Sequence, residues 1–216
     1  HYLRGRDRVE AVCRDIVNTG GTAMAVQADV GDLDSVHAMR GAVAEELGHP
    51  DIIVNNAVHQ YDWTSVLKQA AADYESQFRT CVLHNVFMAK AFVPHMIERQ
   101  WGRVIGINTE CTMQSSPNQS AYIAGKAGQD RVLRVLAKEV GQHGITVNQV
   151  APGWTISDKY RETPAEDKGY RDRVPMGRRG EDQEIANAVA FLASDLAAFI
   201  TGLYLPVCGG NVMPGI

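Results

Sequence analysis

The sequence is poor in the features that mark a secreted or metal-binding protein. Its four cysteines, Cys13, Cys81, Cys111 and Cys208, lie far apart and form no Cys-x-x-Cys pair. This spacing argues against a disulfide framework or a zinc site and favours free thiols in a reducing compartment. The seven histidines are also dispersed, and no His-Glu-x-x-His pair occurs. We therefore expect no metal site and a cytoplasmic location.

Long apolar runs and an excess of positive charge are also missing. No run approaches the roughly 20 residues that span a bilayer, and no apolar targeting core follows the basic N-terminus. The net charge is -4, so nothing predicts binding to nucleic acid. We expect neither a membrane nor a nucleic-acid partner. A chain of 216 residues, 45% of them hydrophobic, instead suits one globular domain over residues 1–216.

Short apolar runs alternate along the chain with longer segments rich in helix formers. The runs predict strands at 22–30, 51–58, 103–109, 145–151 and 203–207, and the segments predict helices at 7–18, 33–47, 71–100, 120–142 and 182–193. Several runs are apolar on consecutive positions, which is typical of parallel strands covered by helices on both faces. The pattern predicts an α/β fold with a doubly wound, Rossmann-like parallel sheet.

A glycine-rich phosphate loop after a first strand is missing as well. The sequence opens on a basic turn and a helix, as though it entered the fold just past a second strand. We expect the first β-α-β segment to be absent from this sequence. The backbone N–H groups that hold a pyrophosphate in such folds would be absent with it.

The strongest chemical signal is Tyr122-Ile-Ala-Gly-Lys126 near the start of a predicted helix. Residues four apart share a helical face. A phenol is a poor base at neutral pH, but a neighbouring ammonium stabilises phenolate and lowers the phenol pKa. The pair can then give a proton to an alkoxide or take one from an alcohol. The alternative is a half-exposed aromatic ring beside a solvated lysine.

Thr109 precedes Tyr122 by thirteen residues and ends an apolar run. Its hydroxyl is placed to bond a substrate carbonyl oxygen and hold it against the phenol. The alternative is that Thr109 bonds only local backbone.

Small or polar residues follow three other predicted strands. The amides of Asn55–Ala57 can tie strand ends together and leave room for a flat ligand. Asp29 can accept a hydrogen bond from an adenine, or it can cap the helix over 33–47. Pro152–Gly153 lets the backbone approach a nicotinamide ring closely. Each piece alone is also typical of an ordinary turn.

Together these pieces resemble the short-chain dehydrogenase/reductase family, and within it the 3-oxoacyl-ACP-reductase-like members. The matching stretches are ADV, NNA, the hydroxyl at Thr109, YxxxK, ITVNQVAPGW and the C-terminal run from GRRGEDQEIANAVAF to the paired glycines. In this order they cover essentially the whole sequence. The resemblance implies an NAD(P)(H)-dependent oxidoreductase that interconverts a carbonyl and an alcohol by hydride transfer.

The resemblance also implies roles for individual residues. Tyr122 would be the catalytic acid/base, Lys126 would lower its pKa and bind the nicotinamide ribose, and Thr109 would orient the substrate. It further implies a homotetramer built on the helices at 71–100 and 120–142 plus C-terminal contacts. The implied cofactor-binding residues are Asp29, Val30, Asn55, Ala57, Tyr122, Lys126, Pro152, Gly153 and Thr155.

Three residues depart from the family pattern. Thr109 stands where the family usually has serine, which adds a methyl group to the pocket. Cys81 stands where it usually has an asparagine that holds a relay water, and a thiol is a weak hydrogen-bond partner. Asn85, one turn on, could compensate. Cys208 replaces a usual aspartate and is expected to affect local structure. Cys81 motivates the alternative of a non-catalytic dinucleotide-binding relative with a binding or regulatory role.

The first residues bear on the choice of cofactor. No carboxylate precedes Asp7, and Arg4 or Arg6 is available to pair with a 2'-phosphate. We therefore favour NADP(H) over NAD(H). The alternative is a basic turn in solvent.

The segment 154–180 is polar, charged and interrupted by Pro164 and Pro175. Since it leaves the sheet at a ligand-binding edge, we expect a lid over the substrate, with an ordinary surface loop as the alternative. Three aromatic residues near strand ends predict either an aromatic pocket or simple packing: Tyr61, Trp63 and Trp154. The sequence names neither the small carbonyl or alcohol substrate nor the direction of the reaction.

Overall fold

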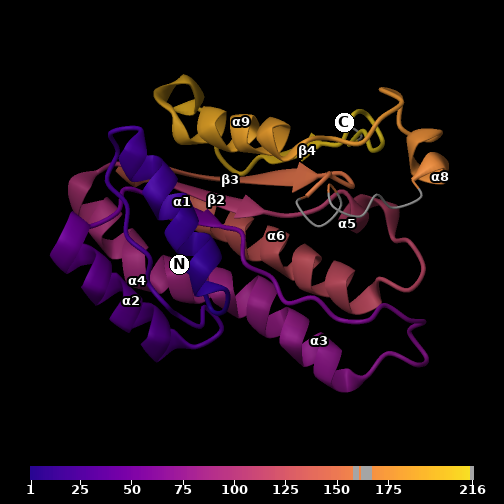
Figure 1. The fold of residues 1–216 in the computed structure, drawn as a ribbon, viewed down its shortest axis with the longest axis horizontal. Helices are drawn as coiled ribbons and strands as arrows, with labels where there is room; N and C mark the ends of the chain where they lie inside the picture. Colours follow the sequence, from indigo (N-terminus) through magenta and orange to yellow (C-terminus); the bar gives the residue numbers. More distant parts are fainter. Residues whose placement is uncertain (158–160, 162–166, 215–216) are drawn as a thin grey trace.

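The computed structural model describes residues 1–157, 161 and 167–214. Its described residues form a parallel sheet of four strands (Figure 1) in the order β1 (Ile52–Asn55), β2 (Gly102–Ile107), β3 (Ile145–Pro152) and β4 (Tyr204–Val207). All three strand pairs are parallel, so the carboxyl ends of the strands lie at one edge of the sheet. Four of the five predicted strands are thereby confirmed, with ends shifted by up to three residues.

Helices precede and connect these strands. The longer ones are α1 (Arg6–Asn18), α2 (Leu33–Leu47), α3 (Ala71–Gln77), α4 (His84–Arg99), α6 (Ser120–Val140) and α9 (Asp182–Ala193). The shorter ones are the π-helix η1 (Phe78–Leu83), α5 (Cys111–Gln114), η2 (Gly141–His143), α8 (Lys168–Arg171) and η3 (Asp195–Ala197). The helical segments predicted from composition are confirmed.

Helices cover both faces of the sheet, as expected of a Rossmann-like architecture. Helices α4 and α6 pack on one face and α9 on the other (Figure 1). Adjacent residues of β2 therefore enter different cores: Val104 packs with the α4 and α6 side, and Ile105 packs with Leu192 of α9. This two-sided burial explains why the strand sequences are apolar at consecutive positions.

The predicted strand over 22–30 was wrong. This segment makes one isolated bridge, Tyr2 with Gln27, supported by two 3.0 Å backbone hydrogen bonds between Tyr2 and residues 26 and 28. A strand requires a run of paired residues on at least one side. Here only Tyr2 pairs with the segment, so the segment does not form a strand of the sheet.

The predicted helix over 71–100 is interrupted by a π-helix. The segment runs from α3 through η1 into α4 without a break, and η1 carries Cys81. Short π-helices widen one turn and often occur at functional sites. Next to it, Gly125 of α6 packs so closely that a Cβ there would lie 2.9 Å from the Gln77 carbonyl oxygen. The lack of a side chain at Gly125 thus brings α6 against the α3–η1 segment.

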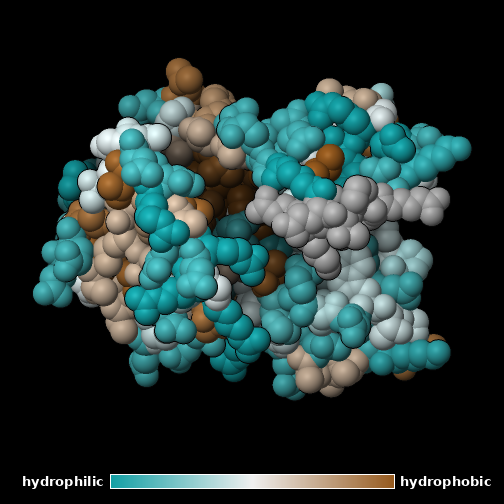
Figure 2. Space-filling model, viewed as in Figure 1, coloured by the Kyte–Doolittle hydropathy of each residue, from teal (hydrophilic) through white to brown (hydrophobic). Residues whose placement is uncertain are grey.

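The surface of the described protein is mostly polar on the face shown in Figure 2, with a hollow that has apolar side chains at its floor. Strand β1 is one source of exposed apolar surface: Ile52 and Val54 are each 43% exposed, while Ile53 between them is buried. Within the described ranges, no helix combines the length and the apolar character needed to cross a membrane.

The segment expected to be a lid lies partly outside the described residues, because 158–160 and 162–166 are not described. Among its described residues, Tyr170 of α8 is buried. The Tyr170 hydroxyl accepts a 2.8 Å hydrogen bond from the Trp154 backbone N–H. A lid function stays a prediction.

Candidate active site

Tyr122 and Thr109 meet at the carboxyl edge of the sheet. Thr109 follows β2, and Tyr122 lies in the first turn of α6. Their side chains both line one cavity of about 640 Å³, together with Pro152, Gly153 and Thr155 at the end of β3. The structure thus brings together five residues that the sequence assigned to the reaction centre and the nicotinamide end. The Thr109 hydroxyl also accepts a 3.2 Å hydrogen bond from the Cys111 backbone N–H, the local bond that the alternative interpretation predicted.

Two aromatic residues from the loop after β1 fix Tyr122. The Tyr61 hydroxyl accepts a 2.7 Å hydrogen bond from the Tyr122 backbone N–H. The Trp63 ring stacks on the Tyr122 ring, with centroids 5.8 Å apart and planes at 26°. Of the three aromatic residues noted in the sequence, these two contact the reaction centre, whereas Trp154 packs edge-on against Tyr170.

Burial raises the pKa of Tyr122 above its ordinary value, and the hydrogen bond with Thr109 opposes this rise. The phenol is therefore neutral at physiological pH and is poised to give a proton rather than to take one. The sequence predicted that the ammonium of Lys126 would lower this pKa. In this structure the group that lowers it is the Thr109 hydroxyl, and the effect of burial is larger.

Lys126 points into the protein beneath the cavity and is 3% exposed. Its Nζ donates to the carbonyl oxygen of Ile107, at the end of β2, over 2.6 Å and to Oε1 of Gln129 over 3.1 Å. Burial lowers the pKa of this lysine. Ile107 lines the candidate active-site cavity, whereas Lys126 is buried behind it and does not itself line the cavity.

Asn108 is a site residue that the sequence reasoning missed. Its Oδ1 accepts hydrogen bonds from the Thr109 backbone N–H over 2.9 Å and from the Tyr204 hydroxyl over 3.1 Å. Its Nδ2 donates to the Lys126 carbonyl oxygen over 3.1 Å and to Gln149 Oε1 over 2.7 Å. One buried amide therefore ties the strand end at Thr109 to the helical turn of Lys126. The signal available was a polar residue between the apolar residues of β2 and Thr109.

Cys81 and Asn85 are both buried beside the site. Asn85 Nδ2 donates to the Cys81 carbonyl oxygen over 2.6 Å, and Asn85 Oδ1 accepts from Asn55 Nδ2 over 2.8 Å. The Cys81 thiol lies 3.7 Å from Gln77 Oε1. Asn85 therefore anchors Asn55 and the η1 backbone. Asn55 Oδ1 is buried without a partner in the described part of the chain, so it can accept a hydrogen bond from a bound molecule.

A second cavity of about 470 Å³ adjoins the first. Asp29, Val30 and Ala57 line it, and Val54 and Asn56 line both cavities. Together the two cavities extend from the N-terminal segment across the end of β1 to Tyr122. This arrangement fits an extended ligand with two ring systems, such as a dinucleotide.

Two predictions about the second cavity have different outcomes. The alternative role of Asp29 as a helix cap was wrong, because the Asp32 carboxylate caps α2 by accepting from Ser35 N–H over 2.9 Å. Arg4 follows Leu3, which lines the cavity, and its own side chain is exposed. A contact of Arg4 with a 2'-phosphate stays a prediction.

Comparison with known proteins agrees with this geometry. A family model described as enoyl-(acyl carrier protein) reductase matches residues 2–211. The chain belongs to the short-chain dehydrogenase/reductase family. It is 34% identical over 214 residues to the 3-oxoacyl-[acyl-carrier-protein] reductase FabG of Staphylococcus aureus (strain Mu50), covering 99% of this chain and 87% of that protein. It is 36% identical over 206 residues to the enzyme of the same name from Pseudomonas aeruginosa, covering 94% and 83%.

A solved structure confirms the fold assignment. It is a gluconate 5-dehydrogenase from Burkholderia cenocepacia J2315, in complex with NADP and tartrate. It superposes with a TM-score of 0.88 at 26% identity and covers 96% of this chain and 82% of that one. The resemblance inferred from the motifs is thereby confirmed at the level of family and fold.

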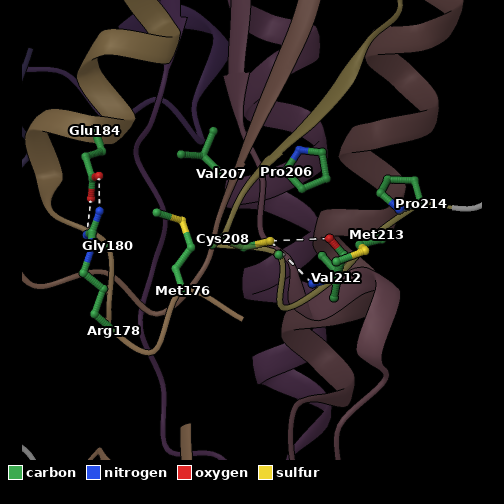
Figure 3. Close-up of a pocket in the computed structure, with 12 residues that line it drawn as sticks. Met176, Arg178, Gly180, Glu184, Pro206, Val207, Cys208, Val212, Met213 and Pro214 are labelled. Atoms are coloured by element: carbon green, nitrogen blue, oxygen red, sulfur yellow. Dashed lines mark hydrogen bonds and ion pairs between the residues drawn. The ribbon is translucent and has the colours of Figure 1, made fainter. Parts of the chain in front are cut away.

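A third cavity in this family member, of about 390 Å³, lies away from Tyr122 between residues 176–180 and the C-terminal loop (Figure 3). Its lining includes Cys208, whose Sγ lies 3.5 Å from both the N and the O of Val212. Cys208 thus holds the turn of the C-terminal loop, a local structural role. Among the described residues, no group of three His, Cys, Asp or Glu side chains is arranged to hold a metal ion.

Proposed function

We propose that this protein is an NAD(P)(H)-dependent oxidoreductase that interconverts a small carbonyl compound and the corresponding alcohol. The observation that carries the proposal is that Tyr122 and Thr109 line one cavity at the carboxyl edge of a parallel sheet. The names of the relatives, all reductases or dehydrogenases, support the same class of reaction.

The nicotinamide ring would supply or accept the hydride. In the direction of reduction, Thr109 and Tyr122 would both donate hydrogen bonds to the substrate oxygen and so favour the negative charge that develops there. Tyr122 would then pass its proton to that oxygen. The raised pKa of the phenol, caused by burial, keeps this proton in place before the reaction. The buried ammonium of Lys126 below the cavity would add positive potential and bind the ribose.

The residues present fit the two ends of the cofactor. Asp29, Val30 and Ala57 would surround the adenine end, and Asn55 would accept a hydrogen bond with its unpaired Oδ1. Pro152, Gly153 and Thr155 would contact the nicotinamide end.

Gly153 is already crowded by the protein, because a Cβ there would lie 2.4 Å from the Tyr170 hydroxyl.

The described residues offer no glycine-rich turn for the pyrophosphate, so the proposal rests on the two ends of the cofactor. We favour NADP(H), since Arg4 follows Leu3, which lines the second cavity, and the solved relative holds NADP.

We also propose a homotetramer in which α4 and α6 of two copies pack together. These helices share an outward-facing apolar groove, lined among others by Val86, Val93, Ile97, Val132 and Val135. Val135 is 55% exposed, which is costly for an isolated chain and suits a symmetric helix–helix contact. Light scattering of the purified protein tests this: a monomer at micromolar concentration would contradict it.

Mixing the protein with NADPH or NADH and a panel of ketones tests the main proposal. The panel should include a 3-oxoacyl thioester and a keto sugar acid, the substrate classes that the relatives' names indicate. The absorbance of the reduced nicotinamide reports turnover. We expect oxidation of NADPH with at least one substrate class.

A second candidate is a non-catalytic dinucleotide-binding relative, which Cys81 favours. It predicts saturable NADPH binding without turnover of any member of the panel in either direction.

A further inference from the structure

Lys126, Gln129 and the carbonyl oxygen of Ile107 form a closed set of hydrogen bonds under the active-site cavity. Lys126 Nζ donates to Ile107 O over 2.6 Å and to Gln129 Oε1 over 3.1 Å. Gln129 Nε2 donates to the same carbonyl oxygen over 3.1 Å. This second bond fixes the orientation of the amide, because its nitrogen faces Ile107 and its oxygen must face the ammonium.

The surroundings leave the ammonium with few other sources of stabilisation. Lys126 and Gln129 are 3% and 1% exposed. The titratable groups facing the lysine are Cys81 on η1, His84 on α4, and Tyr122 and Asp130 one turn away on its own helix. The Asp130 carboxylate accepts hydrogen bonds from Arg134 over 2.7 Å and from Gln149 over 2.9 Å.

The nearer groups are uncharged. Burial raises the pKa of the Cys81 thiol and lowers that of His84 to about 4, so both are neutral at physiological pH. A buried ammonium with two neutral acceptors depends strongly on each of them. Burial by itself favours loss of its proton.

The backbone is shaped to admit Gln129. Gly106 of β2 faces this side chain, and a Cβ there would lie 2.9 Å from Gln129 Nε2 and 2.5 Å from Leu133 Cδ1. A larger residue at position 106 would push the amide away from Ile107. The strand and the helix therefore cooperate to hold a glutamine amide three residues after the lysine.

We propose that Gln129 is a positioning residue, which keeps Lys126 charged beside Ile107, a residue that lines the cavity, and leaves its third N–H for the cofactor ribose. The inference rests on the proposed function, because it gives Lys126 the ribose-binding role. Two of the three ammonium protons are used by Ile107 and Gln129. Without Gln129 the ammonium keeps one acceptor, turns more freely and loses its proton at a lower pH.

Two substitutions of nearly the same size separate this role from simple packing. Gln129→Met keeps the volume and removes the acceptor. Gln129→Glu keeps an acceptor and adds a negative charge beside the ammonium. Packing alone predicts similar effects of both, whereas the positioning role predicts opposite shifts in the titration of Lys126.

The direct measurement is an NMR titration of the lysine side chains in the protein without added cofactor. Lys126 is assigned by the loss of its signal in Lys126→Met. We expect the Lys126 midpoint to fall in Gln129→Met and to rise in Gln129→Glu, relative to the unsubstituted protein. Midpoints that do not move, or that move in the same direction in both variants, would overturn the proposal.

Binding of NADPH, followed by its fluorescence between neutral and alkaline pH, provides the functional measurement. We expect the Kd of Gln129→Met to be about tenfold higher at alkaline pH, where its lysine is neutral, and near that of the unsubstituted protein at the acidic end. A Kd raised equally at all pH values would point to packing and contradict the proposal.

Gln149→Met is the matched control, since Gln149 is also 1% exposed and bonds to Asn108 and Asp130 instead of the ammonium. It removes a hydrogen-bond donor from Asp130, so it should lower thermal stability and should not lower the Lys126 midpoint, in contrast to Gln129→Met. If NADPH fails to bind the unsubstituted protein, the proposed function fails. The titration of Lys126 still decides whether Gln129 holds the ammonium.

Discussion

The Tyr170 hydroxyl donates a 3.1 Å hydrogen bond to Oε1 of Glu110, the residue that follows Thr109 in the chain. The same hydroxyl accepts from the Trp154 backbone N–H over 2.8 Å, and Asn211 Nδ2 donates to the same Glu110 oxygen over 3.0 Å. One buried carboxylate thus connects the end of β2, the turn after β3 and the C-terminal loop. It holds the turn proposed to contact the nicotinamide close to Thr109.

Tyr170→Phe removes this connection and keeps the ring. We expect a loss of about 1–2 kcal/mol in the free energy of unfolding, because the Trp154 N–H and Glu110 each lose a partner. We also expect a several-fold higher KM for the cofactor with a smaller change in kcat, since the turn is no longer held. Denaturant unfolding and steady-state kinetics measure the two effects. An unchanged KM would show that the turn needs no such support.

Glu110 should make the stability of the protein depend on pH. Burial raises its pKa above the ordinary carboxyl value. At pH values between the ordinary pKa and the raised pKa, the carboxyl is protonated in the folded state and ionised in the unfolded state. The free energy of unfolding therefore falls as pH rises through this window. In Glu110→Gln this component is absent. We therefore expect the unfolding free energy of the variant, relative to the unsubstituted protein, to increase as pH rises through the window. A pH-independent difference would contradict this.

Cys81→Asn introduces the asparagine that the resemblance to the family implies for this position. Cys81 is buried on η1, near Lys126, and its thiol is a weak hydrogen-bond partner. An amide there can hold a water and assist proton delivery to the lysine. We expect equal or higher kcat with the best ketone. A large loss of kcat in a variant of normal thermal stability would show that the thiol itself is required.

Gly125→Ala tests the close approach of α6 to the α3–η1 segment. A methyl group would lie 2.9 Å from the Gln77 carbonyl oxygen, which is backbone and cannot rotate away. We expect destabilisation by about 1–3 kcal/mol in denaturant unfolding. Gly141→Ala is the matched control, because a Cβ there meets nothing within 4 Å. Equal stability of both variants would mean that the helices separate at little cost.

The parts of the fold that follow from local sequence were predictable. Strand β2 carries apolar residues at consecutive positions, Val104 and Ile105, because helices bury it on both faces. The segment 22–30 has similar composition but finds only Tyr2 as a partner, because strand formation depends on a distant neighbour that local sequence does not reveal. The π-helix η1 was hidden for a related reason, since it depends on packing against α6.

The candidate site shows the same limit. The sequence predicted Tyr122, Lys126 and Thr109 because their spacing places chemically suitable side chains on one helix and at one strand end. Asn108, Gln129 and Glu110 were missed because their partners come from elements distant in sequence or from backbone atoms. The rotamer of Lys126 also could not be read from a four-residue spacing, which places two side chains on one face without fixing where their ends point.

The reaction of Tyr122→Phe with NADPH and the best ketone tests the central claim most directly. The substitution removes only the phenol oxygen, so NADPH binding and thermal stability should stay close to those of the unsubstituted protein. We predict that kcat falls by at least about a hundredfold, the usual contribution of a positioned general acid. Undiminished turnover in Tyr122→Phe would contradict the account.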